Sequence, residues 1–366
     1  MLKTALKLLL RLGLSFGLLA LLYWKHELPA GEVLSRAAGI AWWAAAGAIL
    51  LDLGGRSLSA FRWTRLAAMA GQKLDYLPAW RLFFSGTFFN ICLPTSIGGD
   101  VVRIVGMGRR TQRLGPALAS VFMDRNVGMA ALLALGLVSA LLVPSTIQAT
   151  LRFLSSDPLV LPLWPLFLLL LLGFALANFL VFRQEPFSWL DRLLLRRLPE
   201  RLRGKLERLH AALQAYRLPL PRFTLVFGVA LLYQASEVLL VYVLALGLGL
   251  ALPFWVFGAM VTFQAAAGLL PITINNLGVR DAVFLAVLIG HLTRQGRPLE
   301  EIKVQAGALA LCYLGVIILS GLAGGLVYAV SGLPKPTREE VRAAETAEAP
   351  PAASAGAVPQ ARNPQA

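Results

Sequence analysis

Long apolar runs alternate with short polar segments along most of this chain. Crossing a bilayer as a helix takes about 20 apolar residues, and about six runs come near that length. They are 8–24, 38–60, 116–143, 160–182, 223–248 and 304–330. Because a helix satisfies its own backbone hydrogen bonds in lipid, the pattern predicts an all-α polytopic membrane protein with about six full spans.

Two other apolar stretches, near 80–108 and 255–290, are interrupted. In each, an apolar run too short to span comfortably leads into a break that contains Pro, Gly and polar residues, and a second short run follows. Irregular backbone at membrane depth must face protein or a water-filled cavity. The pattern therefore predicts two re-entrant broken helical hairpins.

The two breaks can be aligned without a gap. The aligned pairs are Pro94 with Pro271, Ser96 with Thr273, Ile97 with Ile274, Val102 with Val279 and Arg103 with Arg280. Glycines permit a tight turn in each break, and hydroxyl and amide side chains can bond freed backbone groups. A short helix follows each break, with its positive dipole end at mid-membrane and an Arg in its first turns. These features predict an anion site, and the alternative is that the breaks are packing kinks.

Basic residues orient the segments, because Lys and Arg collect in cytoplasmic loops. Arg81 and Arg109 flank the first hairpin, which is predicted to open to the cytoplasm, whereas the loops around the second lack a basic excess. Residues 1–143 and 144–330 then form two membrane repeats with the same plan and opposite orientation, an inverted-topology repeat. Both termini are expected in the cytoplasm, and the protein in the cell inner membrane.

Two segments fall outside this plan. The strongly basic stretch near 183–221 is predicted to be a cytoplasmic amphipathic helix on the membrane surface, or a solvated linker helix. The tail 331–366 is rich in Pro and Ala and is expected to be disordered and cytoplasmic.

Composition supports the membrane class: 57% of residues are hydrophobic, 14% are charged and the mean hydropathy is +0.69. A net charge of +15 is compatible with nucleic-acid binding, but basic cytoplasmic loops account for it, so no nucleic-acid partner is expected. The two cysteines give neither a metal-binding spacing nor a disulfide framework. No metal and no cofactor is predicted.

Charged residues inside membrane segments are costly and are usually functional. Asp100 can partly neutralise the charge of Arg103, which lies one helical turn away. Asp52 can form a structural pair with Arg56, and Asp124 can form one with Arg125. Glu237 has no local partner, so it accepts from one of the arginines or carries a proton that couples transport. Candidate substrate-binding residues are Arg103, Arg280, Arg125, Gly98, Gly99, Asp100, Asn275, Asn276 and Gly278; the candidates for charge pairing or coupling are Glu237, Asp124 and Asp281.

Three motifs resemble those of the lysylphosphatidylglycerol synthase transmembrane-region family, also called the flippase-like domain family. They are LP-x-x-x-GG-[DE]-x-x-R at 93–103, Asp124-Arg125-x-x-Gly128, and LG-x-R-[DE] at 277–281, and the resemblance covers most of 8–330. It implies a lipid-translocating membrane region. Complete synthases carry a soluble aminoacyl-transfer domain after this region, whereas here a short tail follows, so aminoacylation is not implied. Asp100 and Asp281 stand where Glu is the commoner choice, which shortens the reach of the carboxylate.

The sequence thus favours a flippase that moves an anionic phospholipid or a polyprenyl-phosphate-linked lipid between leaflets, with membrane lipids as its partners. One alternative is a secondary transporter of a soluble organic anion. Another is a membrane-embedded lipid-linked transferase, but no catalytic constellation is found, so enzymatic activity is not expected. A third alternative is a non-transporting scaffold for a lipid-modifying enzyme. Such an enzyme is also a candidate partner of a flippase.

Overall fold

The structure is a computed structural model that describes residues 29–69, 71–92, 98–111, 114–155, 164–182, 220–267 and 278–331, with Gly17, Ala20 and Trp24. Every regular element in these ranges is a helix, so the predicted all-α class is confirmed. The helices are α2 (Ala30–Ala38), α3 (Trp42–Met69), α4 (Tyr76–Cys92), α5 (Gly98–Thr111), α6 (Leu114–Leu142), α7 (Pro144–Ser155), α8 (Trp164–Phe182), α11 (Leu220–Gly247), α12 (Phe254–Ala267), α13 (Val279–Leu292), the short η3 (Thr293–Gln295) and α14 (Leu299–Val330).

Several predictions fall outside the described residues. They concern most of the first span 8–24, the centres of the two breaks at 93–97 and 268–277 with Asn275 and Asn276, the segment 183–219, and the tail from 332 onward.

The long helices carry the composition of membrane spans. Leu114–Leu142, Pro221–Gly247 and Leu299–Val330 are long and apolar enough to cross a bilayer, and α8 and α12 contain shorter apolar helices. Large apolar side chains stand exposed on α8 and α14, such as Leu169, Leu172, Leu322 and Leu326. An exposed apolar surface of this extent is unfavourable in water and suits contact with lipid. The polytopic membrane class is therefore confirmed.

The second predicted span differs from the helix that forms. Predicted for 38–60, it begins at Trp42 after a sharp bend of 84° from α2, and it continues to Met69. The extension carries Arg62, which lies beyond the predicted end of the span, into the bundle, where it is buried. Ion pairing explains the difference, because the Arg62 guanidinium pairs with the buried carboxylate of Asp124.

The two halves of the chain pack in matching ways. If α3, α4, α5 and α6 are exchanged with α11, α12, α13 and α14, each major contact among these eight helices has a counterpart. Thus α4 packs on α14 as α12 packs on α6, and α5 contacts α6 as α13 contacts α14. Such correspondence is the packing expected from a repeat.

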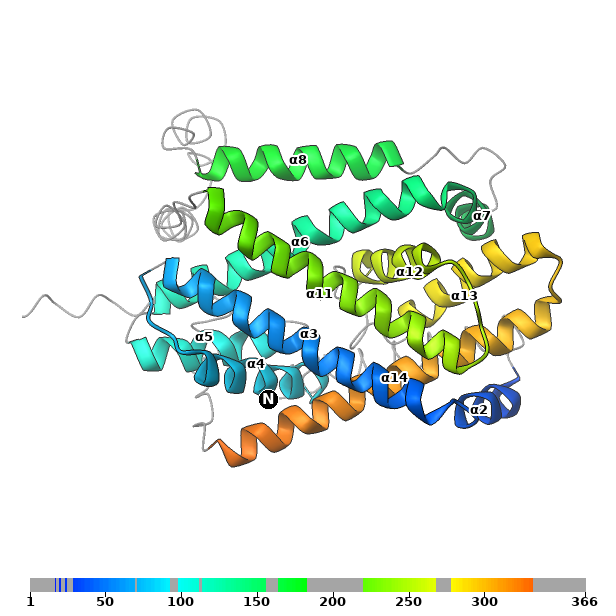
Figure 1. Ribbon diagram of the computed structural model, residues 1–366, viewed down its shortest axis with the longest axis horizontal. Helices are drawn as coiled ribbons and strands as arrows, with labels where there is room; N and C mark the ends of the chain where they lie inside the picture. Colours follow the sequence, from blue (N-terminus) through cyan, green and yellow to red (C-terminus); the bar gives the residue numbers. More distant parts are fainter. Residues whose placement is uncertain are drawn as a thin grey trace, which may run out of the picture.

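Helices α3 and α11 form the central pair of this arrangement and lie side by side (Figure 1). They run antiparallel: the Ala41 N–H at the start of α3 donates to the Gly247 carbonyl at the end of α11, 3.2 Å away. Farther along, Gly55 lies against Ser236. Because these two helices occupy equivalent places in the two halves, the repeats are oppositely oriented.

The hairpins α4/α5 and α12/α13 open at opposite ends of the bundle (Figure 1). The first begins after the C-terminus of α3 and leads into the N-terminus of α6. The second begins after the C-terminus of α11 and leads into the N-terminus of α14. Because α3 and α11 are antiparallel, their C-termini lie at opposite ends of the bundle. The hairpins that follow them therefore also begin at opposite ends.

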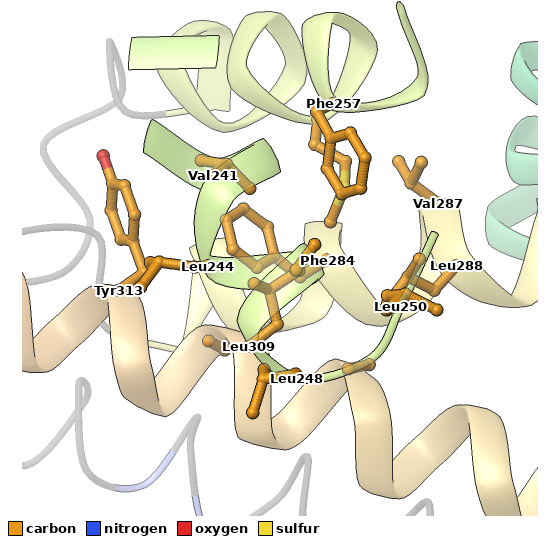
Figure 2. Packing of buried hydrophobic residues seen from close by; sticks show 14 of the residues in the cluster. Val241, Leu244, Leu248, Leu250, Phe257, Phe284, Val287, Leu288, Leu309 and Tyr313 are labelled. Carbon is orange, nitrogen blue, oxygen red and sulfur yellow. The ribbon is translucent and has the colours of Figure 1, made fainter. Parts of the chain in front are cut away.

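The largest apolar core lies in the second half of the chain. Side chains of α11, α12, α13 and α14, among them Leu244, Phe257, Phe284 and Leu309, pack together there (Figure 2). Tyr313 lies at the margin of this cluster with its hydroxyl directed away from the apolar side chains (Figure 2). The core therefore holds the second hairpin rigidly against α11 and α14 and leaves a polar group at its edge.

Candidate functional site

The first broken hairpin is held together at its tip by close backbone contact. Gly86 of α4 and Gly99 of α5 face each other, with no space between them for a side chain. Beside them the Asn90 side-chain oxygen accepts a hydrogen bond from the Gly99 N–H at 2.7 Å. That amide is one of the N-terminal donors of a helix that have no partner within the helix, so Asn90 caps α5 from the other arm.

Substituting Gly99 with alanine tests this contact. The new methyl group would meet the carbonyl oxygen of Gly86, so the two helices must separate. Overpacking of this kind costs about 1–3 kcal/mol, so Gly99→Ala is expected to lower the melting temperature of the purified protein in detergent. Gly54→Ala on α3 is the control, because no atom lies within 4 Å of its new methyl group. Equal melting temperatures for the two variants would contradict the close packing.

A buried ion network lies behind this hairpin, centred on Asp124 of α6. One carboxylate oxygen of Asp124 accepts from Arg62 Nε at 2.8 Å, and the other accepts from Arg103 Nη2 at 2.7 Å. All three side chains are at most 6% exposed. One carboxylate therefore joins three helices, α3, α5 and α6, through two charge-assisted hydrogen bonds.

Asp100 extends the network toward the surface. Its carboxylate receives Arg103 Nη1 at 3.4 Å, as the helical spacing predicted, and Arg125 Nε at 2.9 Å. Arg125 and Asp124 are adjacent in sequence, yet each is paired with a different partner. The Arg125 side chain is 58% exposed, so this guanidinium stands at the boundary between the buried network and the outside of the bundle.

Aromatic rings fix the position of Arg103. Its guanidinium carbon lies 4.4 Å from the Trp63 ring centroid and 4.5 Å from that of Phe83, distances at which a cation is attracted to the ring face. Trp63 is itself held by a hydrogen bond from its indole nitrogen to Ser120 at 3.0 Å. Gly128 of the Asp124-Arg125-x-x-Gly128 motif lies beside the Arg62 guanidinium, where an added methyl group would make an ordinary van der Waals contact.

Asp52 and Arg56 pair with each other on α3, as their spacing predicted. Arg56 Nε and Nη2 donate to the two oxygens of Asp52 at 2.6 and 2.8 Å, a bidentate arrangement. A third nitrogen, Nη1, reaches Thr87 of α4 at 3.4 Å. Arg56 therefore satisfies both oxygens of Asp52, and the pair also contacts α4.

The second hairpin begins its inner helix with a tight turn. Gly278 has φ of +82°, a conformation that costs little only for glycine, and α13 starts at the next residue. Asp281 caps this helix, because its carboxylate accepts the Gly278 N–H at 2.9 Å. Gly278 and Asp281 thus hold the helix start, where the dipole is positive.

Arg280 lies at this helix start and is the most deeply buried of the predicted arginines, at 2% exposure. None of its three side-chain nitrogens has a hydrogen-bond partner within the described residues. Its ion contact with Asp281 is long, at 3.6 Å, and its guanidinium carbon lies 5.3 Å from the centroid of the Tyr313 ring. A buried guanidinium with no acceptor is costly, and an anionic ligand would satisfy it.

A chain of hydrogen bonds connects this region to the middle of α11. The Tyr313 hydroxyl donates to Glu237 Oε2 at 3.2 Å and accepts from Gln264 Nε2 at 3.0 Å. Glu237 also interacts electrostatically with Asp52, Arg56 and Tyr233, and Tyr233 in turn with Arg125. Glu237 therefore accepts a hydrogen bond from a hydroxyl rather than from one of the predicted arginines. It lies between the ion network around Asp124 and the helix start at Arg280.

The structure thus brings the predicted residues into two clusters. Asp100, Arg103, Asp124 and Arg125 share the first, with Gly98 and Gly99 at its hairpin, while Gly278, Arg280 and Asp281 form the second. Contributors that the sequence analysis did not name include Arg62, Asn90, Gln264 and Tyr313, together with the rings of Trp63, Phe83 and Tyr233. For Asn90 the signal was available, since an amide next to a Gly-Gly break in an apolar hairpin is a natural cap.

The fold and the two clusters define the class: a polytopic α-helical membrane protein built from two opposed repeats, each with a broken hairpin and an interior arginine. The family model described as lysylphosphatidylglycerol synthase TM region matches residues 8–331, so the chain belongs to this family. No curated protein matches it. Membership indicates a membrane location and a function related to membrane lipids. Within the described ranges, no group of His, Cys, Asp or Glu is arranged to hold a metal ion.

Proposed function

We propose that this protein is a lipid translocase, not an enzyme, that moves an anionic phospholipid or a polyprenyl-phosphate-linked lipid between the leaflets of the cytoplasmic membrane. The observation that carries the proposal is Arg280, an almost fully buried guanidinium at a helix N-terminus whose nitrogens have no hydrogen-bond acceptor among the described residues. A guanidinium presents a planar fork of donors that matches a phosphate, and the helix dipole adds to the attraction.

Arg125 supports a lipid rather than a soluble ion as the substrate. It is exposed on α6 one turn from Phe122, a large apolar residue that is 42% exposed. A charged head group beside such a surface can be met by Arg125 while the acyl chains stay in the bilayer. The head group would then compete with Asp100 for Arg125, and Asp100 could shift toward Arg103, which it already contacts.

Opposed hairpins supply a means of moving the head group. We infer that both are re-entrant, the first opening to the cytoplasm and the second to the outside, with both termini cytoplasmic as the basic loops indicate. Rocking of one repeat against the other would expose the polar interior to each leaflet in turn. A lipid-modifying enzyme is a suitable partner for such a protein, because it would produce or consume the lipid that is moved.

Reconstitution into liposomes tests this function. With head-group-labelled anionic phospholipid in one leaflet, the wild type is expected to bring label to the other leaflet faster than empty liposomes, and faster than it moves a zwitterionic lipid. Arg125→Gln is expected to slow the anionic lipid by about tenfold or more, since a hydrogen bond to a charged group contributes about 1.5–3 kcal/mol and 1.4 kcal/mol is a factor of ten.

Arg152→Gln is the matched control, because Arg152 is also exposed but lies in α7, away from both clusters. Equal rates for anionic and zwitterionic lipids would contradict a head-group site. Uptake of a soluble organic anion into the vesicles, without movement of lipid, would instead establish the soluble-anion transporter.

A further inference from the structure

Glu237 occupies the middle of α11, is 9% exposed and lies between the two charge clusters. The groups that face it are Asp52 and Arg56 on α3, Tyr233 on its own helix and Tyr313 on α14. From α12, Gln264 reaches it through the Tyr313 hydroxyl, and from α6, Arg125 reaches it through Tyr233. Every helix packed against α11 thus contributes to its surroundings.

The cation that faces Glu237 is already paired with another carboxylate. Arg56 is bound through two nitrogens to Asp52, whose own negative charge opposes that of Glu237. Within the described ranges, the hydrogen-bond partners of the Glu237 carboxyl are neutral hydroxyl groups: Tyr313 donates to it at 3.2 Å, and Tyr233 also bonds to it. By contrast, Asp52, Asp100 and Asp124 each bind a guanidinium at 2.9 Å or less. Glu237 can therefore gain or lose a proton without breaking an ion pair.

The charges of the two clusters and of the groups around Glu237 determine what a proton on Glu237 does. We define the central charge set as Arg56, Arg62, Arg103, Arg125, Arg280, Asp52, Asp100, Asp124, Asp281 and Glu237. Five are guanidinium groups and five are carboxyl groups, so the set is neutral when all are ionised. A proton on Glu237 leaves one positive charge in excess, which a singly charged phosphodiester would balance. Net charge in a medium of low dielectric is costly, so proton and anion favour each other's binding.

Tyr313 connects the two binding events. Its hydroxyl bonds to Glu237, and its ring lies beside the Arg280 guanidinium, 5.3 Å from ring centroid to Cζ. Building on the proposed function, we propose that this protein carries one proton on Glu237 together with each singly charged lipid head group, in the same direction. The proton comes from water on the side where the head group enters and returns to water on the other side, so the transfer is electroneutral.

The test uses liposomes with labelled anionic lipid, an imposed pH gradient, and the membrane potential clamped by potassium and its ionophore. Wild-type protein is expected to enrich the lipid in the leaflet facing the alkaline side, approaching about tenfold for each pH unit at one proton per lipid. In the converse experiment, a lipid gradient should move protons, read by a pH dye trapped inside the vesicles. Glu237→Gln keeps an acceptor for Tyr313 and is expected to exchange lipid at equal pH but to lose the response to the gradient.

Glu300→Gln is the matched control, because that side chain is 68% exposed at the start of α14, and its gradient response should equal that of the wild type. Tyr313→Phe, which removes the hydroxyl, is expected to weaken the response and to keep exchange. Wild-type exchange with no enrichment and no proton movement would overturn the coupling and leave the proposed function standing, as would a Glu237→Gln protein that still responds. Absence of any lipid movement by the wild type would instead count against the proposed function itself.

Discussion

Asp124→Ala is expected to destabilise the protein by about 3–5 kcal/mol, the cost of breaking a buried ion pair by removing one partner. Here one carboxylate serves two guanidinium groups, Arg62 at 2.8 Å and Arg103 at 2.7 Å, and both are almost fully buried. Loss of the Asp124 carboxylate leaves Arg62 and Arg103 without their shortest contacts and removes the ion pairs that join α3 and α5 to α6. Thermal unfolding of the purified protein in detergent, followed by tryptophan fluorescence, measures the effect.

Asn126→Ala is the control for this experiment, since it changes a polar residue of the same helix that takes no part in the network. It should unfold close to the wild-type temperature. If Asp124→Ala were as stable as Asn126→Ala, the network would not hold the three helices together. A double-mutant cycle with Arg62→Ala would then measure the coupling between the two residues directly.

Arg280→Met is expected to abolish lipid transport while the protein keeps its wild-type stability or gains some. The guanidinium is 2% exposed and its nitrogens have no hydrogen-bond partner in the part of the chain that the structure describes, so in the absence of substrate it contributes an unfavourable buried charge. Methionine is apolar and adaptable, and replacing a buried charge with an apolar side chain is often neutral or stabilising. The liposome assay measures transport, and thermal unfolding measures stability on the same sample.

Arg103→Met provides the matched comparison, because it makes the same chemical change at the aligned position of the other half. Arg103 is bound to Asp124 and stacked on two rings, so its loss should lower the unfolding temperature clearly. The two variants therefore differ in the sign or size of their effect on stability. A loss of stability in Arg280→Met as large as that in Arg103→Met would show that Arg280 is a structural residue, and the anion site would have to be abandoned.

Much of the fold was predictable because the bilayer imposes length and polarity on each segment. Apolar runs predicted helices, and the aligned breaks before Arg103 and Arg280 predicted two related hairpins. The predicted end of the second span at residue 60 was wrong, because a sequence does not show that Asp124 will lie opposite Arg62. Positive charge near the end of an apolar run has the same appearance whether it faces the cytoplasm or a buried carboxylate.

For the charged interior, local pairs were predictable and distant ones were not. Asp52 with Arg56 and Asp100 with Arg103 lie one turn apart, so helical geometry alone brings them together. Arg62 with Asp124 and Glu237 with Tyr313 are separated by 62 and 76 positions, and only the packing of different helices joins them. Asp124 and Arg125 are adjacent in sequence but do not pair with each other, because neighbouring side chains on a helix point in different directions. Asp124 pairs with Arg62 and Arg103, and Arg125 pairs with Asp100.

The sequence by itself determined a helical membrane protein with two related halves, two broken hairpins and an arginine after each break, because the periodicity and the cost of polar groups in lipid act locally. Only the tertiary structure decided which of those arginines is neutralised. Arg103 is enclosed by acceptors and rings from three neighbouring helices. Arg280 is buried beside Tyr313 with a long ion contact to Asp281 and no hydrogen-bond acceptor among the described residues. The difference arises because hydrogen bonds have short reach, so a charge is satisfied by whatever the packing of other helices places within about 3 Å of it.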